Sequence, residues 1–287
     1  MTMHDLAVII PCHNESETLA EQLDALVEQR WGHPWEIVVV DNRSTDHTTQ
    51  IAESYADAAV PVRVVHAADR GGVAYARNAG VRASTARSVA FCDGDDVVYP
   101  GWVAAMGEAL RDEPLVTGTL DGERLNARWL AKTRPMGAAE KLPTFGSLPF
   151  ARGNNTAMHR SVWDALDGYD EDFIGLEDIE FSIRAASRGF RPALVPNARI
   201  AYRFRSGLRA TWRQGAFYGR GRAQLASQAH NLGLAGPGRF DGVKSWVWLV
   251  LRAPKVMTKS GRYAWVFTLA NRWGVLRGAL ESRQVFI

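Results

Sequence analysis

Four short, mainly apolar runs near the start of the chain constrain its fold more than any other feature. They cover residues 6–10, 37–40, 62–65 and 88–92. Segments with helical spacing separate them, as the positions of Leu19, Leu23 and Leu26 illustrate. Buried apolar strands that alternate with helices are typical of a parallel sheet covered on both faces. The pattern therefore predicts an α/β fold with a mixed, mainly parallel sheet and helices on both sides.

Polar side chains follow three of these runs where the predicted strands end. They are residues 13–15, residues 41–42 and residues 93–95. In an open parallel sheet, ligands bind beyond the carboxyl ends of the strands. We therefore expect these residues to share one pocket.

Asp93, Gly94 and Asp95 form the first candidate site. Two carboxylates one residue apart can hold a hard cation such as Mg²⁺ or Mn²⁺, which would neutralise charge on a departing diphosphate. Gly94 would let the backbone approach the ligand closely. The alternative is a solvated acidic turn.

The second candidate site would bind a nucleotide. Asp41 could accept the imide N–H of uracil or another base, and His13 could stack on the same ring. The alternatives are a helix cap for Asp41 and a surface histidine for His13. Glycines such as Gly72 stand at the start of the helix predicted over residues 72–83, a position that suits a close approach to phosphate. A dinucleotide fingerprint and a P-loop are both missing from the sequence.

Glu177 and Asp178 begin a predicted helix over residues 177–188. A carboxylate here could act as the general base that deprotonates an acceptor hydroxyl. The alternative is compensation of the helix dipole, because acidic side chains favour the first turn of a helix.

Together these residues resemble family-2 glycosyltransferases with the GT-A fold. The order and spacing of six segments give the resemblance, which spans roughly residues 6–225. The segments are PCHNE (11–15), VVVDNRSTDHT (38–48), RGGVAYARNAG (70–80), FCDGDD (91–96), GNNTAMHRSVWDALDGYDEDF (153–173) and LEDIEFSIRAASRG (176–189).

The resemblance implies an inverting, non-processive transfer of sugar from a nucleotide diphosphate, by default UDP, to a hydroxyl acceptor. It implies Asp178 as the base, Asp95 as the main ligand of Mn²⁺ or Mg²⁺, and Asp93 as a ligand of the metal or ribose. The acceptor side would include Glu177, Asn154 and Asn155. The nucleotide sugar would contact Pro11, His13, Asn14, Glu15, Asp41, Gly72, Arg77, Asp93 and Gly94.

The sequence departs from that family's pattern at two positions. Tyr202 stands where many relatives have a metal-binding histidine, and Arg203 or Arg205 could share the diphosphate charge instead. Arg70 stands where relatives often have asparagine. Two other functions stay open, a sugar-nucleotide nucleotidyltransferase and a non-catalytic nucleotide-sugar binding protein. The PCHNE segment disfavours the first, since nucleotidyltransferases have a glycine-rich basic segment near the N-terminus.

We predict a transferase domain over residues 1–230, with a nucleotide half (1–112) and an acceptor half (113–230). A basic, Trp-rich helical tail would follow at 231–287. Further strands are expected within 193–204, helices at 161–166 and 208–230, and a long surface loop over 121–155. Pro237 and Gly238 would break the chain before the tail.

Charge is distributed very unevenly. Residues 1–180 have 29 acidic and 15 basic side chains, whereas residues 181–287 have 2 acidic and 19 basic ones. Such asymmetry points to an anionic partner. We expect this anionic partner to be the donor phosphates, and we expect no binding to nucleic acid. Peripheral contact with the inner face of the cell membrane and a lipid-linked acceptor are further possibilities. No apolar run is long enough for a signal peptide or a membrane span, and the two cysteines suit buried thiols in a cytoplasmic protein.

Overall fold

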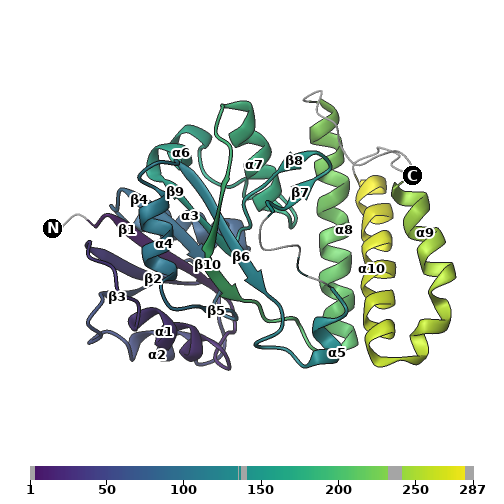
Figure 1. Cartoon of the computed structure of the whole chain (residues 1–287), viewed down its shortest axis with the longest axis horizontal. Coiled ribbons are helices and arrows are strands. Elements are labelled where there is room, and N and C mark those ends of the chain that lie inside the picture. Colours follow the sequence, from purple (N-terminus) through teal and green to yellow (C-terminus); the bar gives the residue numbers. More distant parts are fainter. Residues whose placement is uncertain (1–3, 135, 137–140, 232–240, 282–287) are drawn as a thin grey trace.

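The computed structural model describes residues 4–134, 136, 141–231 and 241–281, and its strands and helices alternate along the first half of the chain (Figure 1). The strands are β1 (Leu6–Cys12), β2 (Trp35–Asp41), β3 (Val62–His66), β4 (Ser88–Cys92), β5 (Val97–Val98), β6 (Leu115–Asp121), β7 (Thr144–Phe145), β8 (Leu148–Pro149), β9 (Asn155–His159) and β10 (Ala193–Ala201). The helices are α1 (Leu19–Val27), α2 (Thr48–Glu53), α3 (Val73–Ala83), α4 (Trp102–Ala109), α5 (Arg128–Ala131), α6 (Arg160–Leu166), α7 (Glu177–Ser187), α8 (Leu208–Asn231), α9 (Asp241–Leu251), the 3₁₀ helix η1 (Ala253–Met257) and α10 (Lys259–Glu281).

Eight strands form one sheet in the order β3-β2-β1-β4-β9-β6-β10-β5. Strands β3, β2, β1 and β4 are parallel, and β10 is parallel to β6. The strand β9 runs antiparallel between β4 and β6, and β5 pairs antiparallel with β10 at the edge. The predicted mixed, mainly parallel sheet is confirmed.

Alternate residues of the central strand β1 face two separate apolar cores. Leu6, Val8 and Ile10 pack on the side of α1, α2 and α4. Ala7 and Ile9 pack on the opposite side, with α3, α6 and α7. Because both faces are covered, every residue of β1 and β2 is buried, and the strands need no polar alternation.

Several predicted elements differ from the structure. The segment 121–155, expected to be a loop, contains α5 and the β7–β8 hairpin, and β6 and β9 beside it were not predicted at all. Residues 193–204 give one strand, β10, with a register shift between Leu194 and Arg199. The break expected at Pro237 and Gly238 lies outside the described residues.

The C-terminal part is helical, as expected, and packs at one end of the sheet (Figure 1). Helices α8 and α10 lie side by side and contact each other through small residues. A Cβ atom at Gly219 would lie 2.1 Å from the carbonyl oxygen of Asn271, and one at Gly274 would lie 2.1 Å from that of Ala216. The two helix backbones can approach this closely only because glycines stand at the contact. The division of the chain at residue 230 stays a prediction.

Candidate active site

Three carboxylates meet in the loop between β4 and β5. Oxygen atoms of Asp93, Asp95 and Asp96 lie within 4.8 Å of one another. Burial and the charge of Asp93 raise the pKa of Asp95 to about 6, and burial and the charge of Asp95 raise that of Glu15 to about 7. Closely spaced, hard oxygen donors in a partly dry site fit a divalent cation such as Mn²⁺ or Mg²⁺.

Asp96 was not among the predicted site residues, although it stands in the quoted FCDGDD segment. Its side chain is almost fully buried and accepts hydrogen bonds from Asn154 Nδ2 at 2.6 Å and from the backbone N–H of Arg203 at 2.9 Å. Two of its lone pairs are therefore used within the protein. Asp96 therefore helps to fix the acidic loop, and Asp93 and Asp95 stay the candidate metal ligands.

Arg77 connects the acidic loop to the start of α7. Its guanidinium donates to Glu177 Oε1 at 2.5 Å and to Asp93 Oδ1 at 3.1 Å, and the side chain is 3% exposed. Its Nε atom is buried without a hydrogen-bond partner among the described residues. The buried charge of Arg77 is thus compensated by carboxylates from two distant segments.

Asp178 lies at the beginning of α7 beside this bridge. Its Oδ2 accepts a hydrogen bond from the backbone N–H of Gly153 at 2.9 Å. Burial, with the neighbouring charge of Glu177, raises the pKa of Asp178 to about 6. Because Asn154 bonds to Asp96 while Gly153 bonds to Asp178, a second bridge joins the acidic loop to α7. The structure therefore brings the predicted metal ligands and the predicted base together.

The loop after β1 is held by the loop after β2. His13 Nδ1 donates to the carbonyl oxygen of Asn42 at 2.8 Å, and Asn14 Oδ1 accepts from the N–H of Thr45 at 2.8 Å. Asn14 has φ 59°, which brings its side chain back over this loop. Both His13 and Asn14 are exposed, and stacking of His13 on a base stays a prediction.

The helix-cap alternative for Asp41 is wrong, because α2 begins only at Thr48 and His47 stands at its N-cap position. Asp41 Oδ1 accepts from the backbone N–H of Ser44 at 3.2 Å, and its Oδ2 lies 3.6 Å from His66 Nδ1. The carboxylate thus closes the turn after β2, as a short Asx turn does. No ligand is needed to explain its position.

Asn42, one of the polar residues noted where the second predicted strand ends, has a structural role that the sequence did not predict. Its Nδ2 donates to the carbonyl oxygens of Ala67 and Arg70, and its Oδ1 accepts from the N–H of Gly72 at 2.8 Å. Gly72 has φ 137°, a conformation that favours glycine, and precedes α3. One buried amide therefore fixes the glycine turn. Its position directly after Asp41 was the only signal in the sequence.

Two predicted nucleotide contacts, Pro11 and Gly94, have clear packing roles. Pro11 is buried in β1 opposite Val40. A Cβ atom at Gly94 would lie 3.0 Å from Cys12 Sγ and 3.5 Å from Glu15 Cγ. The space that Gly94 leaves is therefore occupied by the end of β1 and by Glu15, and the close ligand approach expected from the sequence stays a prediction.

Asn155 does not lie where an acceptor could reach it. The residue is 0% exposed, and its amide bonds to Trp102 Nε1 and to the carbonyl oxygens of Thr119 and Ala198. Through these three hydrogen bonds the Asn155 side chain connects α4, β6 and β10 within the core. The predicted contact between Asn155 and an acceptor therefore does not fit its burial, and that of Asn154 stays a prediction.

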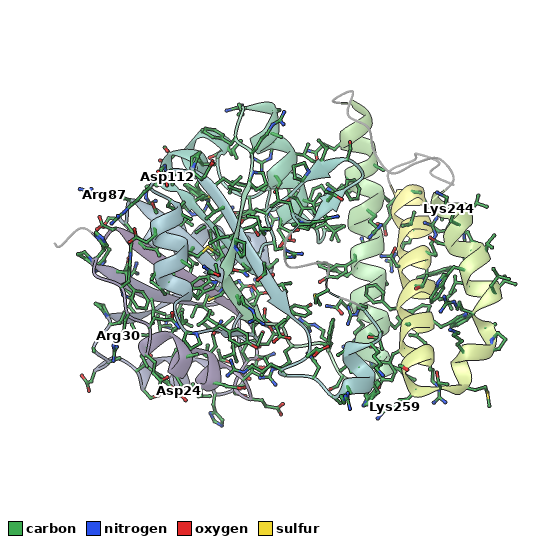
Figure 2. All side chains as sticks on the ribbon, in the orientation of Figure 1. Asp24, Arg30, Arg87, Asp112, Lys244 and Lys259 are labelled. Atoms are coloured by element: carbon green, nitrogen blue, oxygen red, sulfur yellow. The ribbon has the colours of Figure 1, made fainter. Side chains whose placement is uncertain are left out.

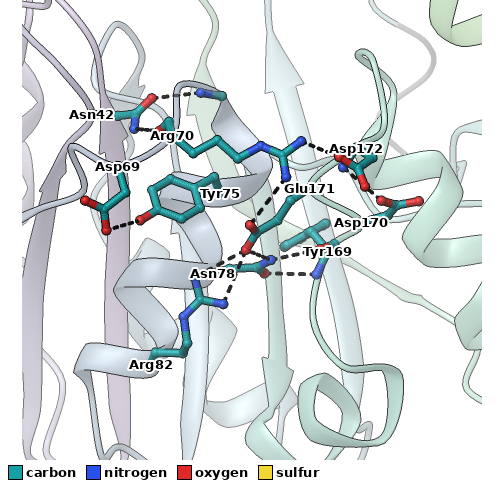
Figure 3. A network of polar contacts seen from close by, with 11 residues as sticks. Asn42, Asp69, Arg70, Tyr75, Asn78, Arg82, Tyr169, Asp170, Glu171 and Asp172 are labelled. Carbon is teal, nitrogen blue, oxygen red and sulfur yellow. Dashed lines mark hydrogen bonds and ion pairs between the residues drawn. The ribbon is translucent and has the colours of Figure 1, made fainter.

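A polar network ties α3 to the loop before α7 (Figure 3). Arg70 reaches across to Asp172 at 2.5 Å, and Arg82 to Glu171 at 3.2 Å. Asn78 donates to the carbonyl oxygen of Tyr169 at 2.8 Å and accepts from its N–H at 2.9 Å. The network gives Arg70, whose role was open, a tethering function.

A hollow of about 460 Å³ adjoins this network, between α3 and α7. Asn78, Arg82 and Arg184 are among its lining residues, whereas no residue predicted for donor, metal or acceptor lines it. The chemistry of the candidate site therefore lies elsewhere.

Two tyrosines, Tyr218 in α8 and Tyr202 just after β10, lie near acidic side chains of the candidate site. Burial and the nearby charges of Asp178 and Glu177 raise the pKa of Tyr218 to about 12. Burial, Tyr218 and the charges of Asp96 and Asp95 raise the pKa of Tyr202 well above its ordinary value. Both phenols therefore stay protonated and uncharged at neutral pH.

The two arginines after β10 differ in their contacts. Arg203 donates to the carbonyl oxygen of Asp95 at 2.8 Å and to Glu21 Oε2 at 2.6 Å, so its guanidinium is engaged within the protein. Arg205 is exposed, and its positive charge offsets part of the rise in pKa that burial and neighbouring carboxylates cause at Glu15 and Asp95.

Solved glycosyltransferases have the same fold. The mannosyltransferase PcManGT from Pyrobaculum calidifontis, solved with GDP-Man and Mn²⁺, matches with a TM-score of 0.69 at 19% identity, over 98% of this chain and 88% of that one. A fragment of S. aureus TarS, solved with UDP-GlcNAc, matches with a TM-score of 0.57 at 15% identity, over 99% of this chain and 93% of that one. These likenesses identify the fold as GT-A.

The chain belongs to glycosyl transferase family 2, whose model matches residues 7–166. The uncharacterized glycosyltransferase YibD of Escherichia coli strain K12 is 34% identical over 154 residues, which is 53% of this chain and 40% of YibD. The chain thus spans well under half the length of that relative. Among the described helices, none has the length and apolar character needed to cross a bilayer.

Proposed function

We propose that this chain is an inverting, metal-dependent glycosyltransferase that moves one sugar from a nucleotide diphosphate donor to an acceptor hydroxyl. The observation that supports this best is the double bridge between the acidic loop and α7. It brings the candidate metal ligands Asp93 and Asp95 to the same side of the sheet as Asp178.

The donor would lie over the carboxyl ends of β1, β2 and β4. His13 is exposed for stacking on the base, and Arg205 would meet the diphosphate. Asp93 and Asp95 would hold Mn²⁺ or Mg²⁺, which when bound supplies positive charge to the departing diphosphate. UDP is our default nucleotide; the neighbouring structures were solved with GDP-Man and with UDP-GlcNAc.

Asp178 would remove the proton from the acceptor hydroxyl. Its raised pKa, about 6, makes it a stronger base than an ordinary carboxylate while leaving it ionised at neutral pH. Arg77 withdraws Glu177 from this role by pairing with it. Asn154, on the same side, would contact the acceptor.

A thermal-shift screen tests the donor half of this proposal. UDP-, GDP- and dTDP-sugars would be added with Mn²⁺, with Mg²⁺ and with EDTA. A donor that binds the folded state at about 100 times its Kd stabilises it by about 2.7 kcal/mol. We expect one nucleotide class to raise Tm only with metal.

Asp95→Ala should abolish that metal-dependent shift, whereas Asp112→Ala, an exposed carboxylate distant from the loop, should not. Transfer or hydrolysis of the same donor would then separate an enzyme from a binding protein. A shift that is equal with EDTA and with Mn²⁺ would contradict the metal site.

A further inference from the structure

Helix α9 exposes its apolar side. Val243, Trp246, Val247, Val250 and Leu251 are all exposed, and their spacing of three, four, seven and eight residues puts them on one face of the helix. Val250 and Leu251 are 74% and 73% exposed. A surface helix normally turns such a stripe toward the core, so this face lacks a partner among the described residues.

Contacts with α10 on the buried side of α9 hold the exposed stripe in place. Leu249 is buried, and its carbonyl oxygen accepts a hydrogen bond from Trp265 Nε1 of α10 at 2.9 Å. Ser245 and Trp248 are the partly covered residues between the exposed ones. The orientation of α9 is therefore fixed by α10.

The 3₁₀ helix η1 extends this surface. Met257 is 85% exposed and lies between the exposed cations Lys255 and Lys259, with Arg252 just before η1. From residue 241 to residue 281 the sequence has seven Lys or Arg and two acidic residues, Asp241 and Glu281. Exposed apolar side chains thus lie among mainly positive charges.

We propose that the outer face of α9 and η1, which we call the docking face, binds the surface of an anionic phospholipid bilayer. Cations with interleaved Trp, Leu and Val suit insertion at the depth of the lipid headgroups. A symmetric contact between two copies would place the same cations against each other. Charge therefore favours lipid over a second copy.

The docking face is linked to the acceptor side of the site. Lys259 Nζ lies 4.1 Å from the ring centroid of Trp129 in α5, and the rings of Trp129 and Tyr263 lie 4.9 Å apart. Helix α5 follows β6, which neighbours β9 and β10 in the sheet. A bilayer on this face would therefore hold the acceptor half near a lipid-linked acceptor.

Vesicle flotation tests the docking face directly. The full chain would be mixed with phosphatidylcholine vesicles with or without about one-third phosphatidylglycerol, at low and at high salt. We expect flotation with the anionic vesicles at low salt and loss of flotation at high salt, because screening is strong above ~0.1 M.

Two double variants test the apolar part and the electrostatic part of the interaction separately. Val250→Asn with Leu251→Asn removes exposed apolar groups, and Arg252→Gln with Lys255→Gln removes two charges. Each pair should weaken anionic-vesicle binding by about tenfold or more. The matched control is Arg30→Gln with Arg87→Gln, two exposed cations at the opposite end of the molecule, labelled in Figure 2, which should bind as the native chain does.

Three results would overturn the proposal. They are no flotation of the native chain, equal loss in the control, and a concentration-dependent dimer that Val250→Asn with Leu251→Asn dissociates. The metal-dependent Tm shift with donor is measured on every variant. A failure of docking with that shift intact leaves the proposed transferase function standing, so the two ideas are tested separately.

Discussion

Arg77 is the residue on which the geometry of the site depends most. It is nearly fully buried, and its two ion pairs join segments 84 residues apart, Asp93 and Glu177. Removing one partner from a buried ion pair costs about 3–5 kcal/mol, because charge is left behind in a poorly solvating environment. Arg77 thus acts as a positioning residue.

We predict that Arg77→Met lowers the free energy of unfolding by about 3 kcal/mol or more and weakens metal-dependent donor binding. Arg77→Lys keeps the charge but loses the fork that reaches both carboxylates, so it should be intermediate. Urea unfolding and donor titration would measure both effects. Arg82→Met, five residues along α3 and half exposed, is the control. Native behaviour of Arg77→Lys in both assays would contradict the bridging role.

Asp178 leads to a prediction about pH. Its folded-state pKa, about 6, exceeds the ordinary value of 3.8, so the carboxyl is protonated below pH 6 and cannot accept a proton there. We expect kcat/KM to fall about tenfold per pH unit below that value. By linkage, the raised pKa also means that the contribution of Asp178 to stability falls as pH rises from 3.8 to about 6.

Asp178→Asn should reduce transfer by about 10²- to 10⁴-fold and remove this acidic limb, with donor binding retained. Asp112→Asn should leave the profile unchanged. The measurement is the pH dependence of kcat/KM from pH 5 to 8. A flat profile for the native enzyme, or full activity of Asp178→Asn, would reject the base assignment.

At the scale of elements, the contact between α8 and α10 depends on glycine. In an isolated helix, alanine is favoured over glycine by about 1 kcal/mol. The contact reverses that preference, because a methyl group at Gly274 would meet the carbonyl oxygen of Ala216. The two helices would have to separate to admit it.

We therefore predict that Gly274→Ala destabilises the protein and increases proteolytic cleavage in α9 and α10. Gly32→Ala is the control, since no heavy atom lies within 4 Å of the position that its methyl group would take. Urea unfolding and limited proteolysis would show the difference. A variant at Gly274 as stable as the native chain would mean that α10 does not need this close approach.

The sequence predicts some elements better than others, for physical reasons. The strands β1, β2 and β4 are apolar because both faces are covered, and that pattern is visible without a structure. The strand β9 has the sequence NTAMH, and its Asn155 is buried only because three partners in distant segments satisfy the amide. No local pattern contains those partners.

The residues of the candidate site also differ in how far the sequence indicates them. Asp93, Asp95 and Asp178 could be named as candidates because their motifs keep the order and spacing of a known family, and their roles stay predictions. The roles of Asn42, Asn78 and Arg70 could not be predicted, since each depends on a loop brought near by the fold. The spacing of four between small residues at 215, 219 and 223, and again at 270, 274 and 278, was a readable signal for the α8–α10 contact.

At the scale of the whole molecule, the two predicted halves share one sheet. Strand β4 of the first half pairs with β9 of the second, and β5 of the first half lies beyond β10 at the far edge. Neither half can therefore complete its hydrogen bonding alone.

We predict that residues 1–112 expressed alone lack a cooperative unfolding transition and bind no nucleotide. The full chain should lose its sheet in one transition. Circular dichroism during urea titration of both would decide. Cooperative unfolding of the fragment would show that the first half is an independent unit.

The two thiols of this protein lie beside the acidic loop. Cys12 and Cys92 are free and buried at the ends of β1 and β4, and burial with nearby carboxylates raises both pKa values well above the ordinary value. Alkylating reagents react with thiolate, so neither sulfur can be modified while these strand ends stay closed. The rate at which Cys12 and Cys92 are alkylated therefore measures how often the ends of β1 and β4 open locally. A ligand bound at the candidate site should slow this alkylation.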